Sequence, residues 1–450
     1  MNEVNDFNEK LSSIVGRENV IVDLSSRKQL SKDFYWYSPV LTDMLDDKIA
    51  DYIVKPSNEE EIKGILSIAV QNKIPVTVRG AGTGNYGQII PMDGGILIDT
   101  TRMNRIIQIE DGSIRVEPGV KLGLIEKKLR EGNQELCIYP STFIKATAGG
   151  FVSGGSGGIG SISWGNLWDG NVLELRVLTM EENPRVLTVK GEEMMNYIHS
   201  YGTTGILTEV VFRTTKRVEW KQCIASFSNL ENSLIFSEKI AKDSTIKKRS
   251  ISTCEWPIPS YFQPLEKVIE PDKHIVILEV EDHSFELVKS LVSEHEGTVT
   301  YEIPPSNYQK GIRLSDFTWN HTTLWALRAN EKMTYLQGSF SLDSYLEQIK
   351  LIKEKYKDEF YNHFDWMRSN GEIIPQQIPL VRYKTKEHLS EMISFCESIG
   401  VKIFDPHTNL LDKGGWEAYI DSVVQKKNEN DPYGLLNPGK IGVVTDLVKG

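Results

Sequence analysis

The chain has 450 residues, of which 40% are hydrophobic and 25% charged, and its formal net charge is −11. This length predicts two or three domains. The negative charge disfavours a nucleic-acid partner, because binding to phosphates needs concentrated Lys and Arg. The one clear basic cluster, Lys247 to Arg249, is expected to be a solvated loop. No apolar stretch approaches the roughly 18 residues of a membrane span. The polar N-terminus, MNEVNDFNEK, is not typical of a signal peptide, so we expect a cytoplasmic protein without a membrane span.

The cysteine pattern predicts isolated reduced thiols and no metal site. None of the four cysteines is paired as C-x-x-C, and no Cys/His cluster has zinc or iron–sulfur spacing. These cysteines are Cys137, Cys223, Cys254 and Cys396.

In chain order, the first 50 residues predict a helix, a short strand over residues 20–24 and an aromatic run, Phe34 to Tyr37, that packs onto the domain. From Tyr52 the pattern is strand, helix, strand. Ser57 and Glu60 match an S-x-x-E capping box, and apolar residues at helical spacing follow. Further strands are expected at residues 74–78, 96–99, 105–109 and 113–116, and a helix at 122–130.

Two segments of the chain are rich in glycine and are expected to be loops. The first reads RGAGTGNYG over residues 79–87, directly after an apolar strand. The second covers residues 140–170, where seven of the fourteen residues from Thr147 to Gly160 are glycine. Glycine exposes backbone N–H groups, so two such loops can hold the two ends of a pyrophosphate. Apolar residues interleave the glycines, which disfavours a flexible linker.

The fragment GSGGIG, residues 155–160, also fits the dinucleotide motif G-x-G-x-x-G. That motif needs a strand just before it, a helix just after it and an acidic residue about 20 positions on. Here the preceding residues are loop-like, and SISWGN does not read as a helix start. An NAD-dependent Rossmann dehydrogenase is therefore disfavoured.

Five separated motifs together resemble the FAD-binding domain of the vanillyl-alcohol-oxidase superfamily, also called the PCMH-type FAD domain. They are VKPSNEEEIKGILSIAVQNKIPVTVRGAGTGNYG, GGILIDTTRMNRI, the loop that begins at Pro140, YGTTGILTEVVFR and DPYGLLNPGK. They occur in the family's order and cover roughly half of the chain. The resemblance includes the FAD-linked oxidases and the enzymes similar to glycolate and D-lactate dehydrogenases.

The resemblance implies the fold and its boundaries. We expect an α+β protein with a two-subdomain PCMH-type FAD-binding domain at residues 1–218. An α+β substrate-binding cap would follow at 219–405, and a C-terminal segment at 406–450 would return to the first domain. Strand and helix patterns after residue 220 predict one antiparallel cap sheet with helices on one face.

The resemblance also implies which residues bind FAD. Asn437 and Lys440 would lie near the isoalloxazine, where a cation stabilises reduced flavin, and Asp169 would be structural. Gly205 and Ile206, with Val210, would line the adenine side. The remaining implied residues are Arg79, Gly80, Ala81, Gly82, Thr83, Gly84, Asn85, Pro140, Ser141, Thr142, Thr147, Ala148, Gly149, Gly150, Ser153, Gly154, Gly155, Gly158 and Ile159.

Two departures from the family pattern predict that the FAD is bound without a covalent link. Covalent relatives often carry a His in the first loop, where this chain has Thr83, Gly84 and Asn85. Bicovalent relatives add a Cys shortly before the second glycine pair, but Cys137 lies twelve residues before Gly149.

Oxidation at carbon needs a base for the hydroxyl or amine proton. His321, between Trp319 and Trp325, and His407 are the candidates, and the other six histidines are expected on the surface. For both candidates a purely structural role stays open. Residues expected to contact substrate are Trp319, Asn320, Arg382 and Asn409. Arg328 and Arg368 are further candidates for a carboxylate, and an ordinary salt bridge is the alternative for each arginine.

The leading hypothesis is an FAD-dependent oxidoreductase that takes a hydride from a CH–OH donor, a 2-hydroxy acid or a sugar-like alcohol. The alternatives are oxidation of a CH–NH donor or a secondary metabolite, and a flavin-binding subunit without its own turnover. The small-molecule substrate would reduce the flavin, and oxygen or another carrier would reoxidise it.

Overall fold

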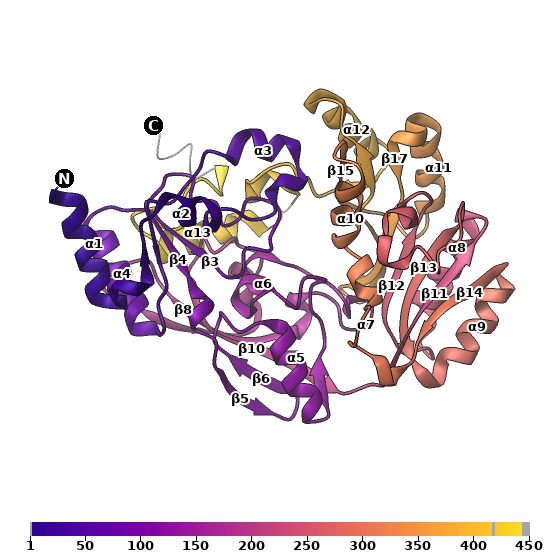
Figure 1. Ribbon diagram of the computed structural model, residues 1–450, viewed down its shortest axis with the longest axis horizontal. Coiled ribbons are helices and arrows are strands. Elements are labelled where there is room, and N and C mark those ends of the chain that lie inside the picture. Colours follow the sequence, from indigo (N-terminus) through magenta and orange to yellow (C-terminus); the bar gives the residue numbers. More distant parts are fainter. Residues whose placement is uncertain (1, 416–418, 443–450) are drawn as a thin grey trace.

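The computed structural model describes residues 2–415 and 419–442, which form two lobes side by side (Figure 1). The N-terminal lobe contains a four-stranded and a six-stranded sheet, and the C-terminal lobe an eight-stranded and a three-stranded sheet. Strand β10 ends at Lys216 and β11 begins at Trp220, so the chain crosses between the lobes within a few residues.

The four-stranded sheet has the order β1-β2-β4-β3, with β2 and β3 parallel to β4 and β1 antiparallel to β2. Its buried face packs on helices α1 and α4. The elements are α1 (Asn2–Val15), β1 (Val20–Ile21), α2 (Leu24–Leu30), α3 (Pro39–Leu45), β2 (Tyr52–Val54), α4 (Glu59–Gln71), β3 (Val76–Arg79) and β4 (Ile96–Asp99).

Two local predictions for this region need correction. The strand expected over residues 20–24 ends at Ile21, because Asp23 caps helix α2 by accepting a hydrogen bond from the Ser26 N–H. The N-cap of α4 is Asn58, which accepts from the Glu61 N–H at 3.0 Å. The predicted capping box was therefore one residue out of register.

The six-stranded sheet is antiparallel, with the order β5-β6-β10-β8-β9 and β7 paired with β10. Helix α5 packs its apolar side, Leu122, Ile125 and Leu129, into the core of this sheet. The elements are β5 (Ile106–Glu110), β6 (Ser113–Val116), α5 (Leu122–Glu131), β7 (Gln134–Leu136), β8 (Val172–Leu178), β9 (Val186–Val189) and β10 (Ile206–Lys216).

The second glycine-rich segment is partly helical, contrary to the expected loop. Helix α6 (Ala148–Gly154) forms because Phe151 and Val152 are buried in the core, which offsets the low helix propensity of glycine. Helix α7 (Ser161–Trp164) begins where no helix start was expected. The dinucleotide interpretation still lacks its context, because α7 is a single turn and the adjoining sheet is antiparallel.

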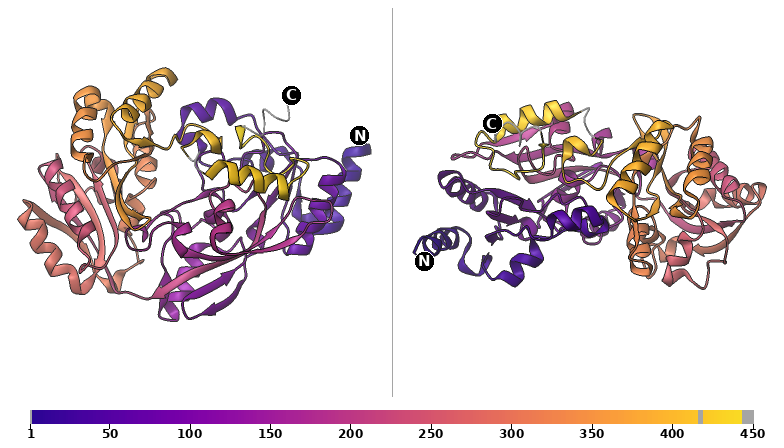
Figure 2. Two further views of the ribbon diagram at one scale, coloured as in Figure 1. Left: turned by 180° about the vertical axis from the view of Figure 1, so that it is seen from behind. Right: turned by 90° about the horizontal axis from the view of Figure 1, so that it is seen from above.

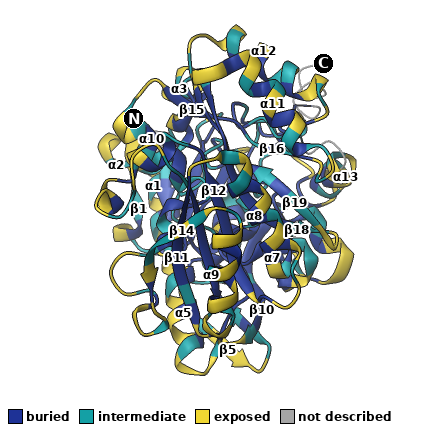
Figure 3. Cartoon of the chain, turned by 90° about the vertical axis from the view of Figure 1, so that its right-hand side faces the viewer, coloured by how far each residue is buried: buried dark blue, intermediate teal, exposed yellow. Residues whose placement is uncertain are grey.

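The eight-stranded sheet of the C-terminal lobe is antiparallel, with the order β14-β11-β13-β12-β18-β19-β16-β21. One face is covered by α8, α9, α11 and α12, whose outward residues are exposed while the strands behind them are buried (Figure 3). The other face packs on α10, which was not predicted, and on the three-stranded sheet β15-β20-β17.

The strands of this lobe are β11 (Trp220–Phe227), β12 (Lys248–Cys254), β13 (His274–Glu281), β14 (Gly297–Ile303), β15 (Met333–Tyr335), β16 (Gly338–Ser339), β17 (Phe360–Tyr361), β18 (His363–Ser369), β19 (Glu372–Gln377), β20 (Leu380–Arg382) and β21 (Lys402–Ile403). The helices are α8 (Leu230–Lys242), α9 (Phe285–Glu294), α10 (His321–Ala329), α11 (Tyr345–Tyr356) and α12 (Lys386–Ser398).

The basic cluster at residues 247–249 is not a solvated loop. Lys248 and Arg249 are buried in β12, and Arg249 has no exposed surface. The Arg249 guanidinium lies 3.4 Å from Glu135 and 3.7 Å from Glu126 of the N-terminal lobe. It also donates to the Leu136 carbonyl at 2.8 Å. This charged group joins the two lobes.

After β21 the chain returns to the N-terminal lobe (Figure 2), where α13 (Ile420–Asn430) packs beside residues Gly191–Asn196. The Asn430 carbonyl accepts from the Met180 N–H at 2.7 Å. Leu436 pairs with Val76 of β3 in a parallel bridge, so the C-terminal segment extends the edge of the four-stranded sheet.

Within the described residues, no helix is long and apolar enough to cross a membrane, and no cluster of three His, Cys, Asp or Glu side chains is arranged to hold a metal ion. All four cysteines are buried free thiols, and burial raises the pKa of Cys137 to about 12.

Candidate functional site

A cavity of about 770 Å³ is walled by both lobes. Its size falls within the ~300–1,000 Å³ of ligand pockets. Residues 79–86, 140–158 and 199–207 contribute the N-terminal wall. The opposite wall comes from residues 313–328 and from strands β16, β18 and β19.

The first glycine loop presents backbone donors to this cavity. Within the described part of the chain, the N–H groups of residues 81–85 have no hydrogen-bond acceptor. Arg79 holds the loop from behind by donating to the carbonyls of Leu30, Lys32 and Gly80. The loop therefore has unsatisfied donors and a fixed backbone, as an anion site requires.

The two glycine segments touch at Gly80 and Thr147. A Cβ placed on Gly80 would lie 2.0 Å from Thr147 Oγ1, so only glycine permits this contact. Thr147 Oγ1 is buried on the cavity wall and, among the described residues, makes no hydrogen bond. The N–H groups of Ser156 and Gly157 likewise have no acceptor in the described chain. These orphaned donors fit the phosphates and polar edge of a bound FAD.

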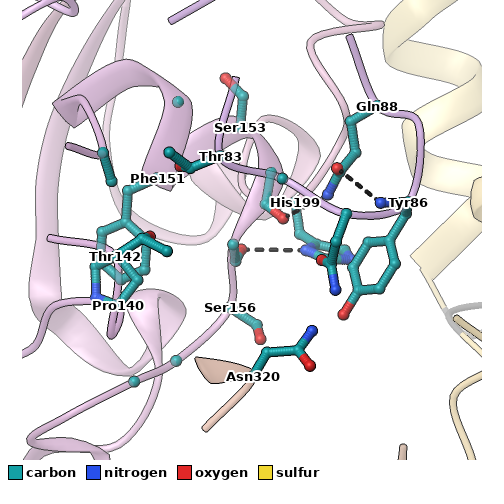
Figure 4. A pocket seen from close by; sticks show the side chains of 18 of the residues that line it. Thr83, Tyr86, Gln88, Pro140, Thr142, Phe151, Ser153, Ser156, His199 and Asn320 are labelled. Carbon is teal, nitrogen blue, oxygen red and sulfur yellow. Dashed lines mark hydrogen bonds between the residues drawn. The ribbon is translucent and has the colours of Figure 1, made fainter. Parts of the chain in front are cut away.

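The segment at residues 199–202 completes this wall, and sequence reasoning missed its first residue. His199 and Tyr201 have left-handed φ values of 54° and 55°, which bulky residues rarely adopt. The His199 N–H donates to the Val152 carbonyl and the Tyr201 N–H to Ser153. His199 Nδ1 lies 3.1 Å from the Gly155 carbonyl (Figure 4). Burial lowers the pKa of His199 to about 4. His199 was expected on the surface. This prediction was wrong because no local sequence pattern indicates that a single histidine is buried.

The C-terminal wall carries Trp319, Asn320 and His321 at the start of α10. Asn320 lines the same cavity as Ser156 and Tyr86 of the N-terminal lobe (Figure 4). Burial, opposed by Asp316 and aided by the nearby cations Arg313 and Arg328, lowers the pKa of His321 to about 4. His321 is therefore a neutral imidazole at neutral pH and able to accept a proton.

Cations surround this part of the cavity. Arg313 pairs with Asp316 at 2.8 Å. Arg328 lies 5.1 Å from the centre of the Trp325 ring and has no carboxylate partner among the described residues. Lys145 also lines the cavity and, within the same part of the chain, has no ion pair.

Three predicted active-site residues lie outside the cavity lining. His407 is buried between the lobes, with Nδ1 2.7 Å from Ser38 Oγ and Nε2 2.8 Å from the Tyr335 carbonyl. Both ring nitrogens are thus engaged, and the position does not favour a catalytic base. Arg382 is exposed on β20, and Asn409 donates to the Gly439 carbonyl. The position of these residues in the sequence could not show whether their side chains face the cavity.

Asn437 and Lys440 also lie behind the wall. Asn437 Nδ2 donates to the carbonyls of Gln88 and Tyr201 at 2.9 and 2.7 Å. Lys440 Nζ donates to the Gly87 carbonyl at 2.7 Å, and burial lowers the pKa of Lys440 to about 7 against the opposing charge of Asp33. Both side chains brace the first loop from behind.

The structure brings most of the implied FAD-binding residues to one wall. Ala148 and Ile159 are buried behind it. Asp169 accepts from the Asn166 N–H at 2.7 Å, which agrees with a structural role. The residues on the wall are Arg79, Gly80, Ala81, Gly82, Thr83, Gly84, Asn85, Pro140, Ser141, Thr142, Thr147, Gly149, Gly150, Ser153, Gly154, Gly155, Gly158, Gly205 and Ile206.

This architecture defines a class: an α+β protein with a PCMH-type FAD-binding fold and a second lobe over the cavity. Residues 50–188 match the family described as FAD binding domain. The chain thus carries a domain of this family, as the resemblance implied.

The curated relatives agree with this assignment. An uncharacterised FAD-linked oxidoreductase of Mycobacterium tuberculosis is 27% identical over 247 residues, 53% of this chain and 52% of the relative. Glycolate oxidase subunit GlcD of Bacillus subtilis is 27% identical over 50% of this chain and 48% of its own. D-lactate dehydrogenase of Archaeoglobus fulgidus is 28% identical over 36% and 38%. The chain spans about half the length, or less, of these relatives.

Among solved structures, an alkyldihydroxyacetonephosphate synthase matches 97% of this chain and 85% of its own with a TM-score of 0.75. Its sequence identity is 16%, so the likeness concerns the fold.

Proposed function

We propose that this protein is an FAD-dependent oxidoreductase that takes a hydride from a CH–OH donor. One observation carries the proposal: a single cavity has orphaned backbone donors on one wall and the neutral His321 on the other. Bound FAD would supply the hydride acceptor. The names of the relatives, which include glycolate oxidase and D-lactate dehydrogenase, support a 2-hydroxy acid over a sugar-like alcohol.

The N-terminal wall would hold the cofactor. The N–H groups of residues 81–85 and the Thr147 hydroxyl would bind its phosphates and polar edges. Lys440 and Asn437 would act indirectly, by fixing the backbone of the first loop. In domain terms, residues 1–218 would bind FAD, residues 219–405 would form the cap, and residues 406–450 would complete the FAD site.

The C-terminal wall would bind and orient the substrate. His321 would accept the hydroxyl proton, and the Trp319 and Trp325 side chains would exclude water beside it. Arg328 replaces Arg382 as the cation for a substrate carboxylate, because Arg328 lines the cavity and lacks a carboxylate partner in the described chain. Oxygen or another carrier would then accept the electrons, in a cytoplasmic setting.

We propose that FAD is held without a covalent bond. Residues 79–87 contain no His, and residues 140–170 contain neither His nor Cys. Acid denaturation followed by centrifugation should therefore release yellow FAD into the supernatant. Colour that stays in the pellet would contradict non-covalent binding.

The activity is tested by adding donors to the FAD-loaded protein without oxygen. Glycolate, D-lactate, a reducing sugar and a primary amine form a suitable panel. Bleaching of the flavin by a hydroxy acid or sugar supports the proposal, and bleaching by the amine alone would favour a CH–NH donor. A protein that holds stoichiometric FAD but responds to no donor would favour a flavin-binding subunit.

A further inference from the structure

A serine, a histidine and an aspartate meet behind the C-terminal wall of the cavity. Ser252 lies on β12, His363 and Asp365 lie on β18, and each is at most 1% exposed. Ser252 is directly opposite Asp365 in the antiparallel pair, so all three side chains share one face. His363 Nε2 lies 3.0 Å from Ser252 Oγ and 3.2 Å from Asp365 Oδ2. None of the three lines the cavity, so the group does not meet substrate.

The histidine and the aspartate share one proton. His363 Nδ1 lies 3.2 Å from the Ile378 carbonyl, which can only accept, so Nδ1 carries a hydrogen. The close contact of Nε2 with Asp365 Oδ2 then needs a second proton between these two atoms. Burial lowers the pKa of His363 and raises that of Asp365, and each group opposes the shift of the other.

The same carboxylate oxygen holds the backbone that leads into α10. Asp365 Oδ2 accepts from the Trp319 N–H at 3.1 Å. Trp319 has a left-handed φ of 52°, which a bulky residue rarely adopts without tertiary support. Thr322 Oγ1 adds a second contact, 3.4 Å from His363 Nε2. The buried pair thus touches this turn on both sides of Asn320 and His321.

We propose that Asp365, together with His363, is a positioning group that holds Trp319 in its left-handed conformation and thereby directs Asn320 and His321 into the cavity. A tryptophan that relaxed to negative φ would change the chain direction immediately before His321. The proposal rests on the proposed function in one respect, the role of His321 as base.

The most informative variant is Asp365→Asn, because the single atom Oδ2 of Asp365 contacts both the Trp319 N–H and His363 Nε2. An amide oxygen in the place of Oδ2 would face the lone pair of His363 Nε2 without a proton between them, so the amide nitrogen is expected to take this place. An amide nitrogen there donates to His363 but opposes the Trp319 N–H. Ser252→Ala is the matched control, since it removes a hydroxyl that contacts His363 and faces Asp365 but leaves the Trp319 hydrogen bond in place.

The first readout is hydrogen exchange of the Trp319 amide in the FAD-loaded protein. The wild-type amide should be protected. Exchange should be about tenfold faster in Asp365→Asn, the scale of one lost hydrogen bond, and unchanged in Ser252→Ala. The proposal is overturned if the Trp319 amide of the wild-type protein is unprotected. It is also overturned if this amide is equally protected in the wild type and in Asp365→Asn.

The second readout is the limiting rate of flavin reduction, with whichever donor of the panel bleaches the flavin. Asp365→Asn should lower this rate roughly 10- to 100-fold with little change in half-saturating donor concentration. In a His321→Ala background, Asp365→Asn should lower the reduction rate little further, because both substitutions act through His321. If the double variant instead loses the product of the two separate effects, the proposal is overturned. If exchange changes as expected but His321→Ala reduces normally, the positioning of the turn stands and the base role of His321 fails.

Discussion

At the scale of single residues, His321 owes its proposed role to its surroundings. Burial and the nearby arginines keep its imidazole neutral. His321→Ala should leave the FAD content unchanged and slow flavin reduction roughly 100- to 10,000-fold, the range for loss of a general base. Stopped-flow absorbance without oxygen measures this rate. His407→Ala is a useful comparison because His407 lies outside the cavity, and an equal loss in both variants would count against a specific role of His321.

The lowered pKa of His321 also sets a pH dependence. A base works in its neutral form, so the reduction rate should stay level as pH falls and drop only when pH approaches about 4. An ordinary histidine would lose activity near pH 6.5. The measurement is the rate of flavin reduction at low donor concentration as a function of pH. A midpoint near 6.5 that disappears in His321→Gln would show that the histidine is not desolvated as described.

At the scale of elements, the contact between the two glycine segments decides whether the cofactor wall forms. Gly80→Ala would place a Cβ 2.0 Å from Thr147 Oγ1. Forcing the segments apart should cost about 1–3 kcal/mol, so FAD should bind roughly 10- to 100-fold more weakly. Gly132→Ala is the matched control, because its Cβ would meet only the Leu129 carbonyl at 3.5 Å. Fluorescence titration with FAD measures the affinity, and equal affinities in the two variants would contradict this account.

Local patterns predicted most elements of the fold, and long-range packing explains the exceptions. The apolar spacing of α4 and the apolar run of β4 are local, and both elements occur where expected. Helix α6 was missed because burial of Phe151 and Val152 overrides glycine propensity. Strand β12 was missed because Lys248 and Arg249 find buried partners far away in the sequence, which no local pattern reports.

At the scale of the whole molecule, the Arg249 group fixes one lobe on the other. Its guanidinium also lies 4.5 Å from the centre of the Tyr139 ring, one residue before the second loop begins. Arg249→Met would leave the buried Glu126 and Glu135 with Arg130 as their only cationic partner among the described residues. Loss of one partner from a buried ion pair costs about 3–5 kcal/mol. Urea unfolding of the FAD-loaded protein should show this loss.

The control for that prediction is Arg217→Met, since Arg217 pairs with Glu219 on the surface. Surface pairs contribute about 0–1 kcal/mol, so this variant should unfold nearly as wild type does. A similarly small effect for Arg249→Met would mean that the lobes are held together by other contacts.

The N-terminal wall of the candidate site was largely predictable from the sequence, and the C-terminal wall only in part. The glycine spacing in residues 79–87 and 140–160 is a local sequence pattern, and it predicted the N-terminal wall. The substrate wall depends on which residues of the second lobe face the first, and this follows from sheet packing. Trp319, Asn320 and His321 were found from their clustering, whereas His199 and Asp365 became visible only through their contacts.

The claim that this protein transfers a hydride from a CH–OH donor to FAD is tested by the effect of deuterium on flavin reduction. The donor is D-lactate or glycolate, whichever bleaches the flavin, carrying deuterium on the carbon that bears the hydroxyl. Transfer of that hydrogen to the flavin predicts slower anaerobic bleaching with the deuterated donor and an unchanged FAD content. Bleaching at the same rate with both donors, or no bleaching by any CH–OH donor, would contradict the claim.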